Sequence, residues 1–289
     1  MEVRLVPDPR LFSEVAGEFS EADPFSTSVI GVHTSAVVAG LRPCGPEDLW
    51  AAVVDRGRVA GVAMHTPPFS LFVSRMAPVA ASALARAVFG LARHVPGVTG
   101  EVVAASAFAG TWAAASGARP AVERNMRMYR LQRLRPPSVP GCAQLAGDND
   151  IEVVTQWFAA FHAEAAPHRP GEDVVEVAKR RLAVGQLSIW VDDGKPVSLA
   201  GCSPPAGGVA RVGPVYTPPL HRRHGYAAAV TAAVTRSAID GGSPHVVLYT
   251  DLANPTSNSV YQSIGFVVDH DAQEWRFTGT GDKAGTVTA

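Results

Sequence analysis

The chain has 289 residues, of which 47% are hydrophobic and 18% charged, a composition typical of one large or two ordinary globular domains. Its 25 basic and 26 acidic residues leave a formal net charge of −1, which argues against a nucleic-acid or anionic-membrane partner. No apolar run reaches the roughly 18–20 residues of a membrane helix. The N-terminal charges and prolines do not suit a signal peptide. Three widely spaced cysteines predict free thiols, so we expect a cytoplasmic protein.

The first half of the chain predicts a hairpin followed by alternating strands and helices. A short helix is expected within 11–19, and residues 34–41 could form a helix or a strand. Two β-branched runs within 49–66 flank Asp55-Arg56-Gly57-Arg58, a pattern typical of a β-hairpin. Further along we expect a strand at 70–74, a helix at 78–94, a strand at 98–103, a helix at 106–116 and a strand at 125–134.

A proline-rich stretch divides the sequence. Three prolines and a glycine between Arg135 and Gly141 cannot continue a helix or a central strand. We therefore predict a linker at 136–147 between two domains, 1–135 and 148–278. Residues 279–289 are expected to be a flexible tail.

The second half repeats the order of the first. We expect helices at 150–164 and 174–184 with a break at 168–171, followed by a hairpin of 187–191 with 196–202. A strand at 209–217, a helix at 225–239 and a strand at 246–250 come next. A short helix that ends before Gly265 and a closing strand at 267–277 complete this half. The shared order predicts a structural repeat.

The entrance of the 225–239 helix is the most informative stretch. Pro218 and Pro219 end a strand, and Arg222-Arg223-His224-Gly225-Tyr226-Ala227 follow. The first N–H groups of a helix have no internal partners and therefore bind anions. Glycine lets a bulky phosphate approach the backbone, and arginine adds bidentate donors. This stretch therefore predicts a phosphate-binding loop.

Three pieces of the second half resemble the GNAT superfamily of acyl-CoA-dependent N-acyltransferases. Arg222-x-x-Gly225-x-Ala227 is similar to the pyrophosphate loop of that family. The strand Val246–Thr250 follows in the same order, and Asn254-Pro255-x-Ser257-Asn258-x-x-Tyr261-x-x-x-Gly265-Phe266 resembles the terminal helix. The resemblance implies an α/β fold of two tandem GNAT-like domains, each a mixed, mostly antiparallel sheet flanked by helices.

The resemblance also implies acetyl-CoA as the co-substrate, without a metal. The pyrophosphate would lie against Arg222, Arg223, His224, Gly225, Tyr226 and Ala227, and the pantetheine arm near Val215, Tyr216 and Thr217. Asn254 and Asn258 would bond the pantetheine or the helix entrance, and Asn254 could also cap the helix, a role compatible with cofactor contact. Tyr261 would protonate the leaving thiolate, because a phenol with a pKa of about 10 can pass a proton to a thiolate of about 8.5–9.

The general base stays open at this point. Glu164 is the first candidate, since it ends a helix in a region that often lines the acceptor cleft of the family; His162 and Asp251 are alternatives. In the first half, Met76-Ala77-Pro78 replaces the arginine–glycine loop, and Ala113 stands at the position of Tyr261. We therefore expect a degenerate first domain and one acetyl-CoA per chain.

The expected function is acetyl-CoA-dependent N-acetylation of the primary amine of a small molecule by direct attack. We expect no nucleic-acid or membrane partner, and a monomer or homodimer. Two alternatives remain: a non-catalytic acyl-CoA-binding or sensing module, which would not need Tyr261, and an enzyme that uses another acyl donor.

Overall fold

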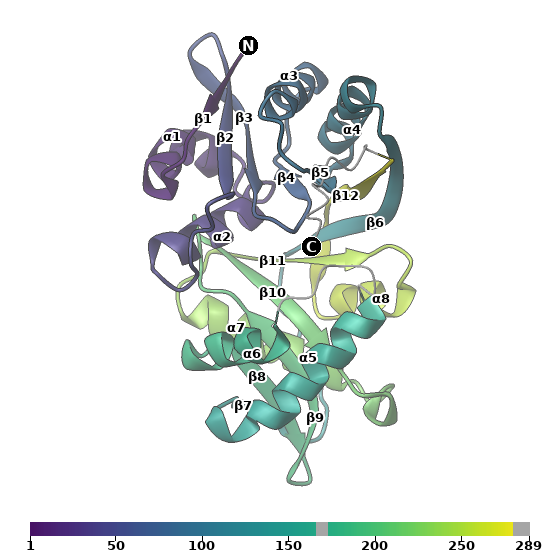
Figure 1. Cartoon of the computed structure of the whole chain (residues 1–289). Coiled ribbons are helices and arrows are strands. Elements are labelled where there is room, and N and C mark those ends of the chain that lie inside the picture. The colour runs from purple at the N-terminus through teal and green to yellow at the C-terminus, as the bar shows by residue number, and fades with distance from the viewer. Residues whose placement is uncertain (166–172, 280–289) are drawn as a thin grey trace, which may run out of the picture. The chain divides into compact units, whose positions relative to one another are not determined.

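The computed structural model describes residues 1–165 and 173–279 (Figure 1). The chain divides into two compact units, one formed by Met1–Met126 with the segment from Asp271 onward, the other by Arg127–His270. The division falls within β6 (Arg119–Leu131) and β12 (Phe266–Thr278), so each of these strands supplies residues to both units. The stretch predicted as a linker, 136–147, includes a short strand, β7 (Cys142–Leu145). The predicted break at 168–171 and the tail from 280 onward lie outside the described residues.

The first unit is a mixed sheet with helices on both faces. Its elements are β1 (Glu2–Leu5), α1 (Pro9–Ala22), α2 (Ser28–Val38), β2 (Leu49–Asp55), β3 (Arg58–His65), β4 (Leu71–Val73), α3 (Pro78–Phe89), β5 (Gly97–Glu101) and α4 (Val102–Ser116). The strand order is β1-β2-β3-β4-β5-β12-β6. β4 and β5 pair in parallel, whereas β1 with β2, β2 with β3, β3 with β4 and β5 with β12 pair antiparallel. The predicted β2–β3 hairpin is confirmed.

Strand β2 explains why this unit needs helices on both sides of its sheet. All of its residues from Leu49 to Val54 are buried, although successive side chains point to opposite faces. Trp50 and Ala52 pack with α1 and α2, while Leu49, Ala51 and Val53 pack with α3 and α4. A continuous apolar strand is therefore typical of a sheet covered on both faces.

The N-terminal region contains more structure than its sequence predicts. α1 extends beyond the expected 11–19 because Asp8 caps it through the N–H of Arg10. α2 lies at Ser28–Val38 rather than 34–41, and β1 was not expected. β1 is four residues long and forms by pairing with β2, a contact that a local pattern does not reveal.

The second unit repeats this plan. Its elements are β7, a 3-10 turn (Asp148–Asp150), α5 (Ile151–Ala165), α6 (Val174–Ala183), β8 (Leu187–Asp192), β9 (Lys195–Cys202), β10 (Val209–Tyr216), a 3-10 turn (Pro219–His221), α7 (Tyr226–Asp240), β11 (His245–Asp251) and α8 (Pro255–Ser263). The strand order is β12-β6-β11-β10-β9-β8-β7, with a parallel β10–β11 pair and antiparallel pairs from β10 to β7. α5 and α6 pack on one face of this sheet, and α7 and α8 on the other.

The expected fold class, two repeated units each with a mixed, mostly antiparallel sheet between helices, is therefore confirmed. One feature of the topology was not expected. The sheet neighbour of β5 is β12, from the end of the chain, and the neighbour of β11 is β6, from its middle. Each half of the sequence thus supplies a strand beside the parallel pair of the other half.

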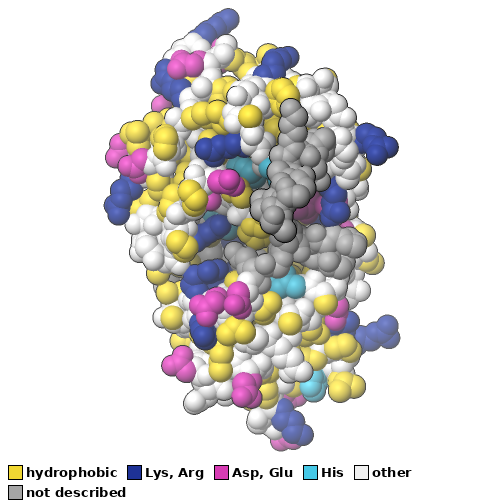
Figure 2. Space-filling view, viewed as in Figure 1, with side chains coloured by type: hydrophobic (Ala, Val, Ile, Leu, Met, Phe, Trp, Pro, Cys, Tyr) yellow, Lys and Arg dark blue, Asp and Glu magenta, His cyan; other side chains and the backbone are white. Residues whose placement is uncertain are grey.

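The surface is mixed in charge, as a net charge of −1 predicts. Acidic and basic side chains are interspersed on the face shown in Figure 2. Of the helices in the described segments, none combines the length and apolar character required to cross a membrane.

Candidate functional site

The parallel strands of the second unit part from each other along their length. Pairing joins Val209–Arg211 of β10 to His245–Val247 of β11, and both strands continue past this ladder. β10 then contains a bulge between Val212 and Val215 in its pairing with β9. Gly213 has a φ of +148° there, and Pro214 has no N–H to donate. The parallel ladder therefore ends where the bulge begins.

The loop between β10 and α7 has a backbone suited to an anion. Arg223 has a φ of +67° and Gly225 a φ of +83°, both in the left-handed region. Gly225 is the N-cap of the 15-residue helix α7 and has no side chain to occupy the free N–H groups. Gly225 directly precedes the right-handed residues of α7, and a left-handed residue beside right-handed ones turns successive N–H groups toward one concave side, the arrangement called a nest. Arginine in this region is uncommon, and it marks a conformation that the surroundings impose.

The other predicted loop residues divide into exposed and buried ones. Arg223 and His224 are exposed, and the His224 ring stacks on that of Tyr226 with centroids 5.5 Å apart. Tyr226 is buried, and its hydroxyl donates to Asp192, a bond that raises the pKa of the phenol. Its side chain therefore anchors the helix entrance to β8. Ala227 lies half-buried in the first turn of α7.

Arg222 connects the loop to the end of α5. Its Nε donates to the Thr217 carbonyl over 2.9 Å, and its Nη2 donates to both carboxylate oxygens of Glu164, at 2.9 and 2.7 Å. The guanidinium also lies 5.9 Å from the ring centroid of Tyr216, whose hydroxyl donates to Glu164 over 3.3 Å. Burial, followed by the nearby Glu164 carboxylate, raises the pKa of Tyr216. Four predicted site residues are thus brought together, with Glu164 already engaged by Arg222.

Helix α8 uses its two asparagines within the protein. Asn254 caps the helix, because its side-chain oxygen accepts from the Ser257 N–H at 3.0 Å. Asn258 accepts from the Tyr129 hydroxyl at 2.9 Å, and its amide donates to the carbonyls of Asp251 and Asn254, at 2.9 and 2.7 Å. The Asn258 side chain therefore ties α8 to the end of β11 and to β6.

Tyr261 lies in the core beneath α8. Its side chain is 9% exposed and meets Phe266 edge-on, with ring centroids 6.4 Å apart. Within residues 1–165 and 173–279, no group hydrogen bonds to its hydroxyl. Burial raises the pKa of Tyr261 to about 12. The phenol therefore stays protonated at physiological pH, the state that a proton donor requires.

This raised pKa predicts a loss of stability in alkali. Both folded and unfolded chains keep the Tyr261 proton below pH ~10, where the unfolded phenol ionises. Above that pH the unfolded state loses the proton and the folded state keeps it up to about 12, so stability falls as pH rises. By pH 11 we expect the wild type to lose about 1.4 kcal/mol more than Tyr261→Phe does, measured by denaturant unfolding at pH 8 and pH 11. Equal losses in the two proteins would contradict the raised pKa.

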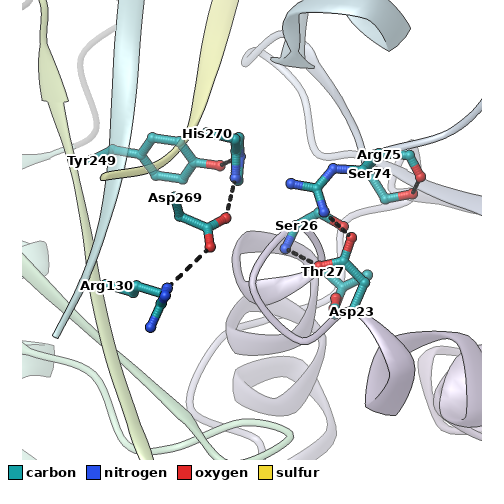
Figure 3. Close-up of polar contacts among 9 residues, drawn as sticks. All are labelled: Asp23, Ser26, Thr27, Ser74, Arg75, Arg130, Tyr249, Asp269 and His270. Carbon is teal, nitrogen blue, oxygen red and sulfur yellow. Dashed lines mark hydrogen bonds and ion pairs between the residues drawn. The ribbon is translucent and has the colours of Figure 1, made fainter. Parts of the chain in front are cut away.

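A second polar cluster, not predicted from the sequence, joins β11, β12 and β6 (Figure 3). The Tyr249 hydroxyl lies 3.1 Å from Nε2 of His270, and Nδ1 of His270 lies 2.7 Å from Oδ2 of Asp269. Nε of Arg130 lies 3.5 Å from Oδ1 of Asp269. The guanidinium of Arg211, on β10, is 5.8 Å from the centroid of the Tyr249 ring. The only signal of this cluster in the sequence is His270 flanked by two aspartates in a predicted strand.

The remaining candidates for a general base have other contacts. Asp251 accepts from the Ala253 N–H at 2.7 Å, which closes the turn after β11. His162 is exposed on α5, with its ring edge-on to Phe161 at 5.7 Å between centroids.

The first unit differs at the corresponding helix entrance. All three residues of β4 pair with β5, and a Cβ on Gly100 would lie 2.5 Å from the Val73 carbonyl oxygen. Met76, 6% exposed, fills the space beside Gly61, so that a Cβ there would lie 2.7 Å from its Cε. Arg75 forms a 2.8 Å ion pair with Asp23 (Figure 3). This entrance therefore has a closed ladder and an apolar side chain where the second unit has an exposed basic loop.

Several known proteins with similar sequences or folds belong to one family. Residues 151–266 match the family model described as the acetyltransferase (GNAT) family. A GNAT-family acetyltransferase from Colwellia psychrerythraea is 12% identical over 96% of this chain and 99% of that chain, with a TM-score of 0.57. A GCN5-related N-acetyltransferase from Sphaerobacter thermophilus is 16% identical over 95% of each chain, with a TM-score of 0.61. A tandem GNAT protein from the clavulanic acid biosynthesis pathway is 16% identical over 97% of this chain and 99% of that chain, with a TM-score of 0.57. A search of curated protein sequences found no match. At these identities, the similarity to solved structures establishes the fold alone.

Proposed function

We propose that the chain transfers the acetyl group of acetyl-CoA to the primary amine of a small molecule, since residues 151–266 match the model of the GNAT acetyltransferase family. The observation that carries this proposal is the α7 entrance. There a strand leaves its parallel partner, and two left-handed residues lead into a helix whose N-cap is a glycine. Such an entrance offers several backbone N–H donors and two exposed arginines to a pyrophosphate.

The loop residues fit the requirements of a CoA thioester. The N–H groups of the 222–227 stretch would hold the pyrophosphate, and the backbone at Val215 and Thr217 would hold the pantetheine arm. Arg222 would contact the pyrophosphate either after its ion pair with Glu164 breaks or while it contacts both Glu164 and the pyrophosphate. Its ion pair with Glu164 is 44% and 50% exposed, so solvent screens it and it contributes less than about 1 kcal/mol.

This competition for Arg222 gives a test of the role of Glu164. Glu164→Gln removes a negative charge next to the pyrophosphate loop and releases Arg222 from its charged partner. We expect acetyl-CoA to bind about 2–5 times more tightly, and kcat to stay within about fivefold of the wild type. Calorimetry and steady-state kinetics measure the two quantities. A kcat at least 100-fold lower would instead identify Glu164 as the general base.

We propose one acetyl-CoA per chain, bound by the second unit. The closed β4–β5 ladder and the packed Met76 in the first unit support this stoichiometry. The near-neutral net charge and the interspersed surface charges support a small acceptor rather than a nucleic acid.

The burial of Tyr261 favours a second candidate, a non-catalytic acyl-CoA-binding module. A phenol with a pKa of about 12 is a weaker acid than a free tyrosine, and a binding module would not need it. A single experiment separates the two functions. Purified protein is incubated with acetyl-CoA and a panel of primary amines, and both the released CoA thiol and the N-acetylated product are measured. Equal amounts of both support the enzyme. Binding of acetyl-CoA without transfer to any amine supports the module, and no binding contradicts both.

A further inference from the structure

The cluster of Tyr249, His270 and Asp269 has the connectivity of a proton relay. Nδ1 of His270 faces the Asp269 carboxylate, so an ionised Asp269 requires the N–H on Nδ1. Nε2 then carries the lone pair and accepts from the Tyr249 hydroxyl. The His270 side chain is 7% exposed and that of Asp269 is 14% exposed, so water competes little for these bonds. The arrangement is a hydroxyl, a base and an orienting carboxylate, in that order.

The position of Tyr249 puts this relay at the end of the strand ladder. Tyr249 lies two residues past Val247, the last residue of β11 that pairs with β10. Val246 and Leu248 pack in the core with Tyr261, so alternation sends the Tyr249 side chain to the opposite face of the sheet. The Arg211 guanidinium over its ring agrees with that direction. Tyr249 and Tyr261 therefore lie on opposite faces of the sheet at β11, near the point where β10 stops pairing with β11.

We propose that Tyr249, His270 and Asp269 take up the proton that the acceptor amine loses, an inference that rests on the proposed acetyl transfer. As the amine nitrogen bonds to the thioester carbon, its proton passes to the Tyr249 oxygen, and the Tyr249 proton passes to Nε2 of His270. Asp269 stabilises the imidazolium. The carbon–sulfur bond breaks with its electron pair on sulfur, and Tyr261 protonates the thiolate. Exchange with solvent then returns one proton to Tyr261 and removes one from His270.

The charged groups around His270 suit this role. Asp269 holds one side of the ring and is itself contacted by Arg130 from β6, while Arg211 from β10 lies over Tyr249. Both arginines favour the anionic form of the groups that they approach, Arg130 at the carboxylate and Arg211 at the phenol. Tyr249 would be the residue that touches the amine, whereas His270 and Asp269 would act through it as positioning and proton-storing residues.

The test compares Tyr249→Phe, His270→Gln, Asp269→Asn and the double variant of Tyr249 and His270, with His245→Gln as the matched control. His245 is exposed at the other end of β11 and lies outside the relay. With a primary alkylamine acceptor, we expect kcat to fall about 100-fold in Tyr249→Phe and His270→Gln. We expect acetyl-CoA affinity to stay within threefold. The double variant should be no slower than either single variant, because the two residues act as one unit.

A weakly basic aromatic amine as the acceptor separates a role of the relay residues in proton transfer from a purely structural role. Such an acceptor arrives unprotonated and needs less help from a base, so the loss in kcat should shrink to below about tenfold. Equal losses with both amines, additive losses in the double variant, or variants as fast as the wild type would each overturn the relay. If the wild type itself binds no acetyl-CoA, the proposed function fails.

A spectroscopic measurement tests the relay without any acceptor. Nitrogen NMR of the full chain, with His270 assigned by comparison with His270→Gln, should show that the neutral form of the ring carries its proton on Nδ1. Asp269→Asn should change that tautomer. Protonation on Nε2 in the wild type would overturn the proposal.

Discussion

Tyr261→Phe is expected to lower kcat about 100- to 1000-fold while acetyl-CoA affinity changes by less than threefold. Without the phenol, the CoA thiolate must leave unprotonated, and a positioned acid contributes about 10²–10⁴ in rate. The Tyr261 side chain is 9% exposed, and its hydroxyl has no hydrogen-bond partner in the described parts of the chain, so its removal should leave stability at pH 8 nearly unchanged. Steady-state kinetics and denaturant unfolding measure the two effects separately.

Tyr129→Phe is the matched control for this substitution. Tyr129 packs in the same core, but its hydroxyl donates to Asn258. We expect the opposite pattern, with stability lowered by about 1–2 kcal/mol and kcat retained. If Tyr261→Phe transfers acetyl groups within threefold of the wild-type rate, Tyr261 is not the acid.

Gly225→Val is expected to weaken acetyl-CoA binding about 100-fold. Gly225 has a φ of +83°, which a β-branched residue adopts only at a cost of a few kcal/mol. A Cβ there would also lie 3.0 Å from Cγ2 of Val139. The first turn of α7 would relieve this strain by moving, and the N–H groups proposed to hold the pyrophosphate would move with it. Calorimetric titration with acetyl-CoA measures the loss.

Gly242→Val provides a control on the same helix. Gly242 follows the C-terminal end of α7 with a φ of +87°, so valine there meets a similar backbone penalty. A Cβ at Gly242 meets nothing within 4 Å. We expect a similar loss of stability with acetyl-CoA affinity preserved. Equal affinities in the two variants would contradict the assignment of the α7 entrance as the binding loop.

Local sequence patterns predict most helices and strands of the fold. Where the structure differs from the prediction, the cause is either a local cap or pairing with a distant segment. Helix α4 begins at Val102 rather than the expected 106, because the Glu101 side chain caps the N–H groups of Val103 and Ala104. β1 and β7 are short strands that exist through pairing with neighbours. The placement of β12 beside β5, and of β6 beside β11, joins segments far apart in the sequence. The periodicity of a single segment does not indicate which distant strand will lie beside it in the sheet.

The candidate site likewise combines motifs that are contiguous in the sequence with contacts between distant residues. The anion loop and the α8 motif are contiguous in sequence, and their residues could therefore be named in advance. The Asn258 partner, Tyr129, is 129 residues away, and the Arg222 partner, Glu164, is 58 residues away. The Tyr249–His270 contact also depends on the strand order. Long-range pairs of this kind decide which polar groups are already engaged, and the sequence alone does not specify them.

We expect each chain to bind one acetyl-CoA, at the entrance of α7. Calorimetric titration of the full chain with acetyl-CoA tests it most directly, with Gly225→Val measured in parallel. We predict one site per chain in the wild type, and about 100-fold weaker binding in the variant. Two sites per chain, or an affinity that Gly225→Val leaves unchanged, would contradict the claim.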